Sequence, residues 1–199
     1  MLKLGITGGI GSGKSVVCRI LGCFGIPVFR ADDEGRRLLT GDAETAREVT
    51  SLLGSAILTD GRPDPKKIAP LVFADPARLR SLNDIIHPAV RRSFTAWCGN
   101  FKKGCVAEEA DILFESGAYQ LLDRVIVVTA PQQLRIKRVT ERDKLGEEDV
   151  KRRMQFQWSD DELVKRADFV IRNDDRTPLI PQVMNILEKL KSECKDINN

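Results

Sequence analysis

A short glycine-rich segment near the start of the chain has the residue types that bind phosphate groups. It reads Gly8-Gly9-Ile10-Gly11-Ser12-Gly13-Lys14-Ser15 and matches the pattern G-x-x-x-x-G-K-S/T at every required position. Glycines let the backbone turn tightly and point its N–H groups at phosphate oxygens, the lysine reaches the β- and γ-phosphates, and the serine hydroxyl binds Mg²⁺. We therefore predict a nucleoside triphosphate site. Its expected contacts are Gly8, Gly9, Gly11, Ser12, Gly13, Lys14, Ser15 and Val16.

This motif needs a strand before it and a helix after it, and the sequence predicts both. Residues 2–7 predict a short strand, and from Ser15 the apolar residues recur at helical spacing until Gly25. Residues 28–31 predict a second strand, which ends at Asp32. A strand, a crossover helix and a second strand form one βαβ unit, which indicates a parallel sheet. The positive end of the helix dipole would strengthen the phosphate site.

The rest of the chain predicts a helical stretch, more strands and a charged helical segment. Three strands are predicted, at residues 105–114, 125–129 and 169–171. Residues 41–104 and 131–166 are mostly helix-forming, and an amphipathic helix over residues 179–190 closes the chain. We predict an α/β fold with a three-layer core around a parallel sheet of five strands, a helical insertion and a helical lid.

Composition and charge exclude several classes of protein. The 199 residues are 42% apolar and 31% charged, as in globular proteins, and no apolar run reaches the ~18 residues that span a bilayer. The start of the chain lacks a signal-peptide cleavage site, so we expect neither a membrane protein nor a secreted one. A net charge of +3 is too weak to predict a nucleic-acid partner. Five cysteines without a C-x-x-C pair, and a single histidine, argue against zinc and for a reduced, cytoplasmic location.

A phosphate-binding loop does not by itself identify a reaction. Asp32-Asp33-Glu34-Gly35 resembles the Asp-x-x-Gly switch of GTPases. No Asn-Lys-x-Asp motif follows, because Arg172-Asn173-Asp174 lacks both the lysine and the spacing. A mechanical ATPase would need a longer chain with a coupling domain. The sequence therefore favours a small-molecule kinase with a substrate-binding insertion and a lid.

Motifs in order along nearly the whole chain resemble those of the dephospho-CoA kinase family. The opening strand and the phosphate-binding loop agree almost residue by residue over residues 5–15. The further matches are Ala31-Asp32, Asp60-Gly61, Val72-Phe73, Ile86-His87-Pro88, residues 112–117, residues 138–143 and residues 167–174. The loop alone is not specific to this family, but the ordered set is.

The resemblance implies a fold similar to the nucleoside monophosphate kinases and the last reaction of coenzyme A synthesis. In that reaction ATP donates its γ-phosphoryl group to the 3′-hydroxyl of dephospho-CoA, with Mg²⁺ as cofactor, and CoA and ADP result. The implied single domain, 1–199, has a core of residues 1–40, 105–130 and 167–199, a substrate-binding insertion of residues 41–104 and a lid of residues 131–166. We expect a monomer or a small homo-oligomer whose partners are ATP and dephospho-CoA.

Some positions depart from the family pattern. Arg30 stands where the family often has aspartate, and Pro65 where it usually has arginine. Glu109 and Asp111 stand where apolar residues, proline or alanine are common, and Val16 replaces a common threonine. Two other functions therefore stay open. One is another kinase of this fold, such as one for a nucleoside monophosphate, and the other is a non-catalytic nucleotide-binding regulator.

Asp32 is the predicted catalytic carboxylate. It follows the second strand, at the edge of the sheet where ligands bind in parallel α/β folds. There it could accept the proton of the substrate hydroxyl, orient that hydroxyl or hold a Mg²⁺-bound water. An ordinary turn residue is the alternative. Asp33 is expected to point elsewhere.

Three arginines fall on one face of the predicted lid helix, at i, i+3 and i+7: Arg135, Arg138 and Arg142. Arginines that close onto a transferring phosphoryl group stabilise its charge. The family resemblance supports that catalytic role for Arg138 and Arg142. It does not support it for Arg135, which we expect to be solvated.

His87 and Asn173 are weaker predictions. A helix beginning at Pro88 would make His87 a neighbour of the helix cap with a structural role, and a substrate contact is the alternative. Asn173 follows the last predicted strand and is an expected adenine contact. Trp97 and Trp158 could belong to the core or stack on adenine, and the core is favoured for Trp97.

Overall fold

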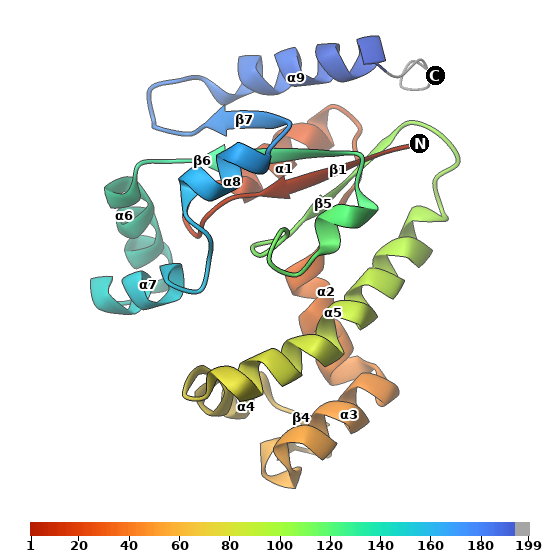
Figure 1. The fold of residues 1–199 in the computed structure, drawn as a ribbon, viewed down its shortest axis with the longest axis vertical. Helices are drawn as coiled ribbons and strands as arrows, with labels where there is room; N and C mark the ends of the chain where they lie inside the picture. Colours follow the sequence, from red (N-terminus) through yellow and green to blue (C-terminus); the bar gives the residue numbers. More distant parts are fainter. Residues whose placement is uncertain (194–199) are drawn as a thin grey trace. The chain divides into compact units, whose positions relative to one another are not determined.

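The computed structural model describes residues 1–193 (Figure 1). The chain forms two compact units. One contains Met1–Phe29 and the chain from Asn100 onward, and the other contains Arg30–Gly99. The sequence predicts that all five cysteines are buried or incidental thiols, and one of them, Cys194, lies outside the described residues. The division into core, insertion and lid stays a prediction.

The first unit is built on the predicted parallel sheet. Its strands are β1 (Leu2–Thr7), β2 (Val28–Arg30), β5 (Cys105–Glu109), β6 (Arg124–Thr129) and β7 (Phe169–Arg172), in the order β2-β5-β1-β6-β7. The pairs β1–β5, β1–β6 and β6–β7 are parallel. The strand predicted over residues 105–114 is shorter, because the chain turns after Glu109. The phosphate-binding loop leaves the sheet from its central strand, β1.

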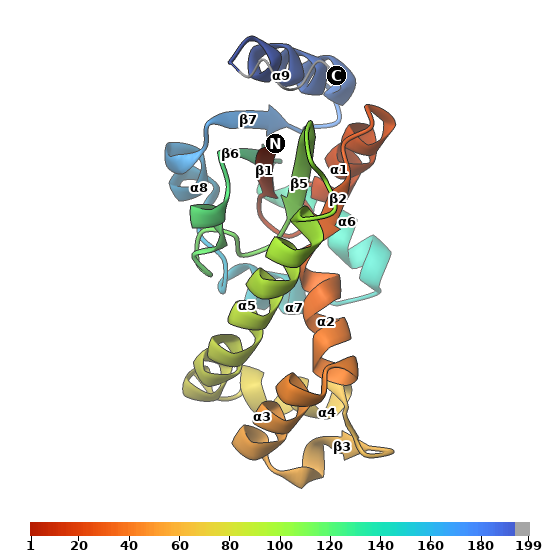
Figure 2. The same cartoon turned by 90° about the vertical axis from the view of Figure 1, so that its right-hand side faces the viewer.

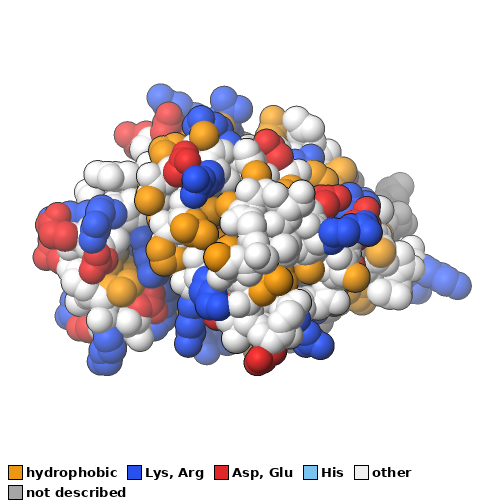
Figure 3. Space-filling model, turned by 90° about the horizontal axis from the view of Figure 1, so that it is seen from below, with side chains coloured by type: hydrophobic (Ala, Val, Ile, Leu, Met, Phe, Trp, Pro, Cys, Tyr) orange, Lys and Arg blue, Asp and Glu red, His pale blue; other side chains and the backbone are white. Residues whose placement is uncertain are grey.

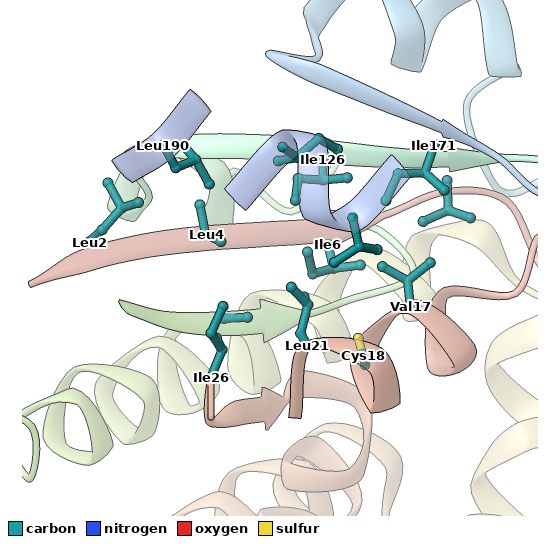
Figure 4. Packing of buried hydrophobic residues seen from close by; sticks show 14 residues of the cluster. Leu2, Leu4, Ile6, Val17, Cys18, Leu21, Ile26, Ile126, Ile171 and Leu190 are labelled. Atoms are coloured by element: carbon teal, nitrogen blue, oxygen red, sulfur yellow. The ribbon is translucent and has the colours of Figure 1, made fainter. Parts of the chain in front are cut away.

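Helices cover both faces of this sheet (Figures 1 and 2). The helices α1 (Lys14–Cys23) and α9 (Leu179–Glu193) pack on the face formed by Leu2, Leu4 and Ile6, as Figure 4 shows. On the opposite face lies α8 (Asp160–Arg166). This three-layer arrangement confirms the predicted fold class. It follows from strands whose alternate side chains on both faces are apolar and need cover.

Two further helices continue the first unit after β6. They are α6 (Gln132–Asp143) and α7 (Glu147–Met154). Both contribute to a small apolar cluster in which Ile136, Val139 and Val150 pack with Ile10. Ile10 belongs to the phosphate-binding loop, so the predicted lid helices and the loop share apolar contacts. A short 3₁₀ helix, η2 (Ala118–Leu121), precedes β6.

The second unit is mostly helical, as predicted. Its elements are α2 (Ala31–Gly41), α3 (Ala43–Leu53), η1 (Ser55–Ile57), β3 (Leu58–Thr59), β4 (Arg62–Pro63), α4 (Pro65–Phe73) and α5 (Pro76–Cys98). It has an apolar cluster of its own, formed by Leu39, Val49, Ile57, Ile68 and Val72. Exposed ion pairs lie along its helices, such as Arg36 with Asp33. On the face seen in Figure 3, acidic and basic side chains are interspersed.

The predicted helix start at Pro88 is wrong. Helix α5 begins at Pro76, and Pro88 lies inside it. The cap is Asp75, whose carboxylate accepts hydrogen bonds from the N–H groups of Ala77 and Arg78. A proline inside a helix removes one backbone hydrogen bond. Packing of α5 against α2, α3 and α4 outweighs that loss, and no local signal could show this.

Candidate active site

The phosphate-binding loop is held in a conformation that depends on glycine. Gly13 has φ 96°, and a Cβ atom there would lie 2.0 Å from the amide nitrogen of Asn173. A Cβ atom on Gly9 would lie 1.9 Å from the guanidinium of Arg135. Helix α1 begins directly after Gly13 without a side-chain cap, so its first N–H groups are available to an anion. The Ser12 hydroxyl is buried and has no hydrogen-bond partner within residues 1–193.

Lys14 is buried at the base of this loop with 6% of its surface exposed. Its Nζ donates to the carbonyl oxygens of Gly8 (2.8 Å) and Gly9 (3.4 Å). It also forms an ion pair of 2.7 Å with Oδ1 of Asp111, in the segment that follows β5. The ammonium group therefore lies inside the loop, where bound phosphates would meet it.

Ile10 is fixed from both sides by groups that lie far away in the sequence. Its N–H donates to Oε1 of Gln157 (2.7 Å), and its carbonyl accepts from Nε of Arg135 (2.9 Å). The Gln157 amide nitrogen donates in turn to the carbonyl of Asp111 (3.1 Å). Arg135 also pairs with Asp160 at 2.7 Å. The sequence did not predict Gln157 or Asp160 as part of the site.

The prediction that Arg135 is solvated is wrong. Only 8% of its surface is exposed, and its guanidinium joins the loop carbonyl of Ile10 to the first turn of α8. A lysine- and arginine-rich helix face looks solvated in the sequence. The side chain of Arg135 is nevertheless buried, because α8, a later helix of the chain, places Asp160 beside it.

We expect Arg135→Met to lower the free energy of unfolding by about 2 to 3 kcal/mol, because the carbonyl of Ile10 and the partly buried carboxylate of Asp160 would both lose their charged donor. Urea unfolding followed by circular dichroism measures this. Lys137→Met is the matched control, since Lys137 is exposed on the same helix and should change stability little. Equal stabilities of the two variants would contradict the role of Arg135.

Arg138 and Asn173 join the loop to the segment after β7. The Arg138 guanidinium donates to the carbonyl of Gly11 (3.4 Å) and to the carbonyl and side-chain oxygens of Asn173 (3.1 and 3.3 Å), and it pairs with Asp175. Asn173 is buried, and its amide nitrogen donates to the carbonyl of Ser12 (2.8 Å). The structure thus brings both predicted residues to the loop. The adenine contact of Asn173 stays a prediction.

Arg142, in contrast, bonds to its sequence neighbour. Its Nε and Nη2 donate to the carboxylate of Asp143 at 2.7 and 3.0 Å. This pairing lowers the pKa of Asp143, and Arg153 approaches the same carboxylate at 3.7 Å. The Arg142 side chain is 63% exposed, so a phosphoryl group could compete for it. Its catalytic role stays a prediction.

Asp32 and Ser15 both lie in first turns of helices. Asp32 is the second residue of α2 and is exposed. The strand predicted over residues 28–31 ends at Arg30, so Ala31 separates β2 from Asp32. Asp32 is a helix residue and not part of a turn, because α2 begins at Ala31. Ser15 and Val16 lie in the first turn of α1, with Ser15 exposed. Asp33 pairs with Arg36 across an exposed turn of α2.

His87 lies in the middle of α5 and is partly buried. Burial lowers the pKa of His87, the positive charge of Arg91 lowers it further, and Asp84 opposes this effect. The folded chain therefore disfavours a proton on His87, whose unfolded pKa is about 6.5. Both the structural role of His87 and its substrate contact stay predictions.

Because the pKa of His87 is lowered on folding, the unfolded chain binds more protons below about pH 6.5, and stability is lost as the pH falls through that value. We expect the free energy of unfolding to fall between pH 7.5 and 5.5, and to fall less in His87→Gln. Urea titrations of both proteins at the two pH values test this. An identical pH dependence would show that His87 does not contribute.

Trp158 follows Gln157, the residue that binds Ile10 of the loop. Its ring stacks on Phe114 with centroids 5.9 Å apart, and the guanidinium of Arg166 lies 4.8 Å from its centroid. Trp97 packs against Phe94 in the second unit.

A signal for the segment after Gln157 was present in the sequence, because Ser159 and Glu162 form a capping box that marks the start of α8.

Comparison with known proteins identifies the family. The family model for dephospho-CoA kinase matches residues 2–178. A dephospho-CoA kinase of Bacteroides fragilis (strain YCH46) is 37% identical over 205 residues, which cover 100% of this chain and 99% of that protein. One of Chlorobaculum tepidum is 42% identical over 204 residues, covering 98% and 93%. The crystal structure of TT1252 from Thermus thermophilus has a TM-score of 0.82 and 34% identity, covering 96% of this chain and 97% of that one. The chain therefore belongs to the dephospho-CoA kinase family.

Proposed function

We propose that the chain transfers the γ-phosphoryl group of ATP to the 3′-hydroxyl of dephospho-CoA and releases CoA and ADP, the last step of coenzyme A synthesis. The observation that carries the proposal is the loop itself. It places a buried lysine and the uncapped start of α1 together, in a chain that matches the family along nearly its full length.

The loop would hold the phosphates of ATP. Backbone N–H groups at the start of α1 and the Lys14 ammonium supply positive charge without needing to reorganise during the reaction. Arg138 lies beside the loop, and Arg142 has an exposed guanidinium that could turn toward the transferred group. Both are proposed to stabilise the charge that develops on the phosphoryl oxygens.

Mg²⁺ is the proposed cofactor, and Ser15 fits it. Mg²⁺ prefers oxygen ligands and keeps most of its sphere for water and substrate phosphates, so one exposed hydroxyl beside the phosphate site is a suitable protein ligand. No cluster of three His, Cys, Asp or Glu side chains forms a metal cage within residues 1–193. When bound, the ion would neutralise charge on the β- and γ-phosphates.

Asp32 is proposed to act on the acceptor hydroxyl. Its carboxylate can accept the hydroxyl proton and aim the oxygen at the γ-phosphorus. The exposed position in the first turn of α2 leaves the carboxylate accessible to a substrate. The helical second unit, which contains His87, is proposed to hold dephospho-CoA.

An acceptor comparison tests the reaction. ADP release is measured by a coupled assay with ATP and Mg²⁺, and with dephospho-CoA, AMP or CMP as the acceptor. We expect turnover with dephospho-CoA well above that with either nucleotide. Preference for AMP or CMP would identify a nucleoside monophosphate kinase, and activity with none of the three would favour a nucleotide-binding regulator.

Residues 131–166 are proposed to form the lid, with motion concentrated in α7. Arg135 and Ile136 of α6 are buried against the loop. In α7 only Val150 is buried in the same cluster, and the helix otherwise carries exposed ion pairs such as Lys151 with Glu147. We expect hydrogen exchange in α7 to slow when a non-hydrolysable ATP analogue and dephospho-CoA bind together, because closure would shield it from water. Amides of α6 should be protected throughout. Unchanged exchange in α7 would contradict closure there.

A cytoplasmic location and a monomeric or small homo-oligomeric state are also proposed. Cys18, Cys23, Cys98 and Cys105 form no disulfide within the described residues, which suits a reducing compartment. Within residues 1–193, no helix is long and apolar enough to cross a bilayer.

A further inference from the structure

The carboxylate of Asp111 forms an ion pair with Lys14, the lysine of the phosphate-binding loop. The ammonium group of Lys14 has three protons and three acceptors around it, namely the carbonyls of Gly8 and Gly9 and Oδ1 of Asp111. A phosphate that takes a hydrogen bond from Lys14 must therefore replace one of them. Asp111 is the exchangeable one, because its side chain is 44% exposed and can be solvated after release.

The backbone of Asp111 is held beside the loop without help from its carboxylate. The preceding residue, Ala110, donates its N–H to the carbonyl of Ile6 (3.1 Å). The carbonyl of Asp111 accepts from Gln157, which also binds Ile10. Replacing the carboxylate should therefore leave the segment in place, so the charge can be tested separately from the backbone.

We propose that Asp111 is a positioning residue that occupies Lys14 as a stand-in for phosphate, and that a nucleotide phosphate exchanges for it on binding. The inference rests on the proposed nucleotide site. The bonds from Lys14 to Gly8 and Gly9 keep Nζ inside the loop during the exchange. Asp111 thereby weakens the binding of both ATP and ADP, and it favours release of ADP after the reaction.

Removal of the carboxylate should strengthen nucleotide binding. Asp111→Asn keeps the shape of the side chain and removes the charge that competes for Lys14. We expect the Kd for ADP, measured by isothermal titration calorimetry in EDTA, to fall about fivefold. This change corresponds to the upper end of the free energy that an exposed ion pair contributes.

Two controls separate exchange on Lys14 from general electrostatics. Asp161→Asn removes the same charge from an exposed position in the first turn of α8 and should leave the Kd for ADP unchanged. In a Lys14→Met background, Asp111→Asn should no longer tighten ADP binding, because the ammonium group for which Asp111 and the phosphate compete is gone. Equal tightening in that background would mean direct repulsion between carboxylate and phosphate and would overturn the proposal.

Titration of the protein with ATP in the presence of Mg²⁺ tests the alternative that Asp111 helps to hold the metal ion. Weaker binding by Asp111→Asn only when Mg²⁺ is present would show that role and overturn the proposal. An unchanged Kd in Asp111→Asn, with normal binding by the unmodified chain, would also overturn it. Failure of the unmodified chain to bind ADP would refute the nucleotide site itself, and this inference with it.

Discussion

Lys14→Ala should lower kcat by about a thousandfold, because it removes a preorganised charged donor from the oxygens on which charge develops during phosphoryl transfer. The fold should survive, since Lys14 is not part of the apolar cluster between β1, α1 and α9. The loop loses the bonds from Nζ to Gly8 and Gly9, and the released Asp111 carboxylate is partly solvated. Steady-state ADP release with dephospho-CoA measures the effect.

Loss of activity must be distinguished from loss of structure. Lys14→Met keeps the aliphatic part of the side chain in the buried position and should be as inactive as Lys14→Ala while retaining more stability. Lys137→Ala removes an exposed lysine from α6 and should turn over like the unmodified chain. Near-normal kcat in both Lys14 variants would exclude this loop as the ATP site.

Asp32→Asn should lower kcat by about 10²- to 10⁴-fold, the usual contribution of a positioned base. The amide keeps the shape and one acceptor oxygen but loses the charge and the basicity. Because the transition state is loose, aiming of the hydroxyl matters as well, and Asp32→Ala should be slower still. The affinity for ATP should change little, since the loop after β1 holds the phosphates. Steady-state kinetics measure the change in kcat, and calorimetry measures the affinity for ATP, so the two effects can be separated.

Asp33→Asn, at the adjacent position, provides a matched control. Asp33 lies in the same first turn of α2 and carries the same charge, but it pairs with exposed Arg36. We expect its kcat to stay close to that of the unmodified chain. If Asp32→Asn behaved like Asp33→Asn, Asp32 would be neither a base nor an anchor for a metal-bound water. It would then be an ordinary residue in the first turn of a helix.

The sequence by itself determined the features that depend on neighbouring residues. The phosphate-binding loop is one, because its glycine spacing, its lysine and the strand and helix on either side are all local. The buried strand β6 is another, since Val125, Ile126, Val127 and Val128 have β-branched side chains that favour a strand and are apolar on both faces. The five strands and the three-layer core followed from such local patterns.

Only the tertiary structure decided which polar groups meet at the loop. Arg135 looks like a member of a solvated basic face, and Asp111 like an unexplained departure from the family pattern. The structure instead buries Arg135 between Ile10 and Asp160, and it pairs Asp111 with Lys14. Likewise, α5 continues through Pro88 because other helices pack against it. The physical reason is the same in each case: the partner comes from a distant part of the chain, and its position is set by sheet order and helix packing rather than by local sequence.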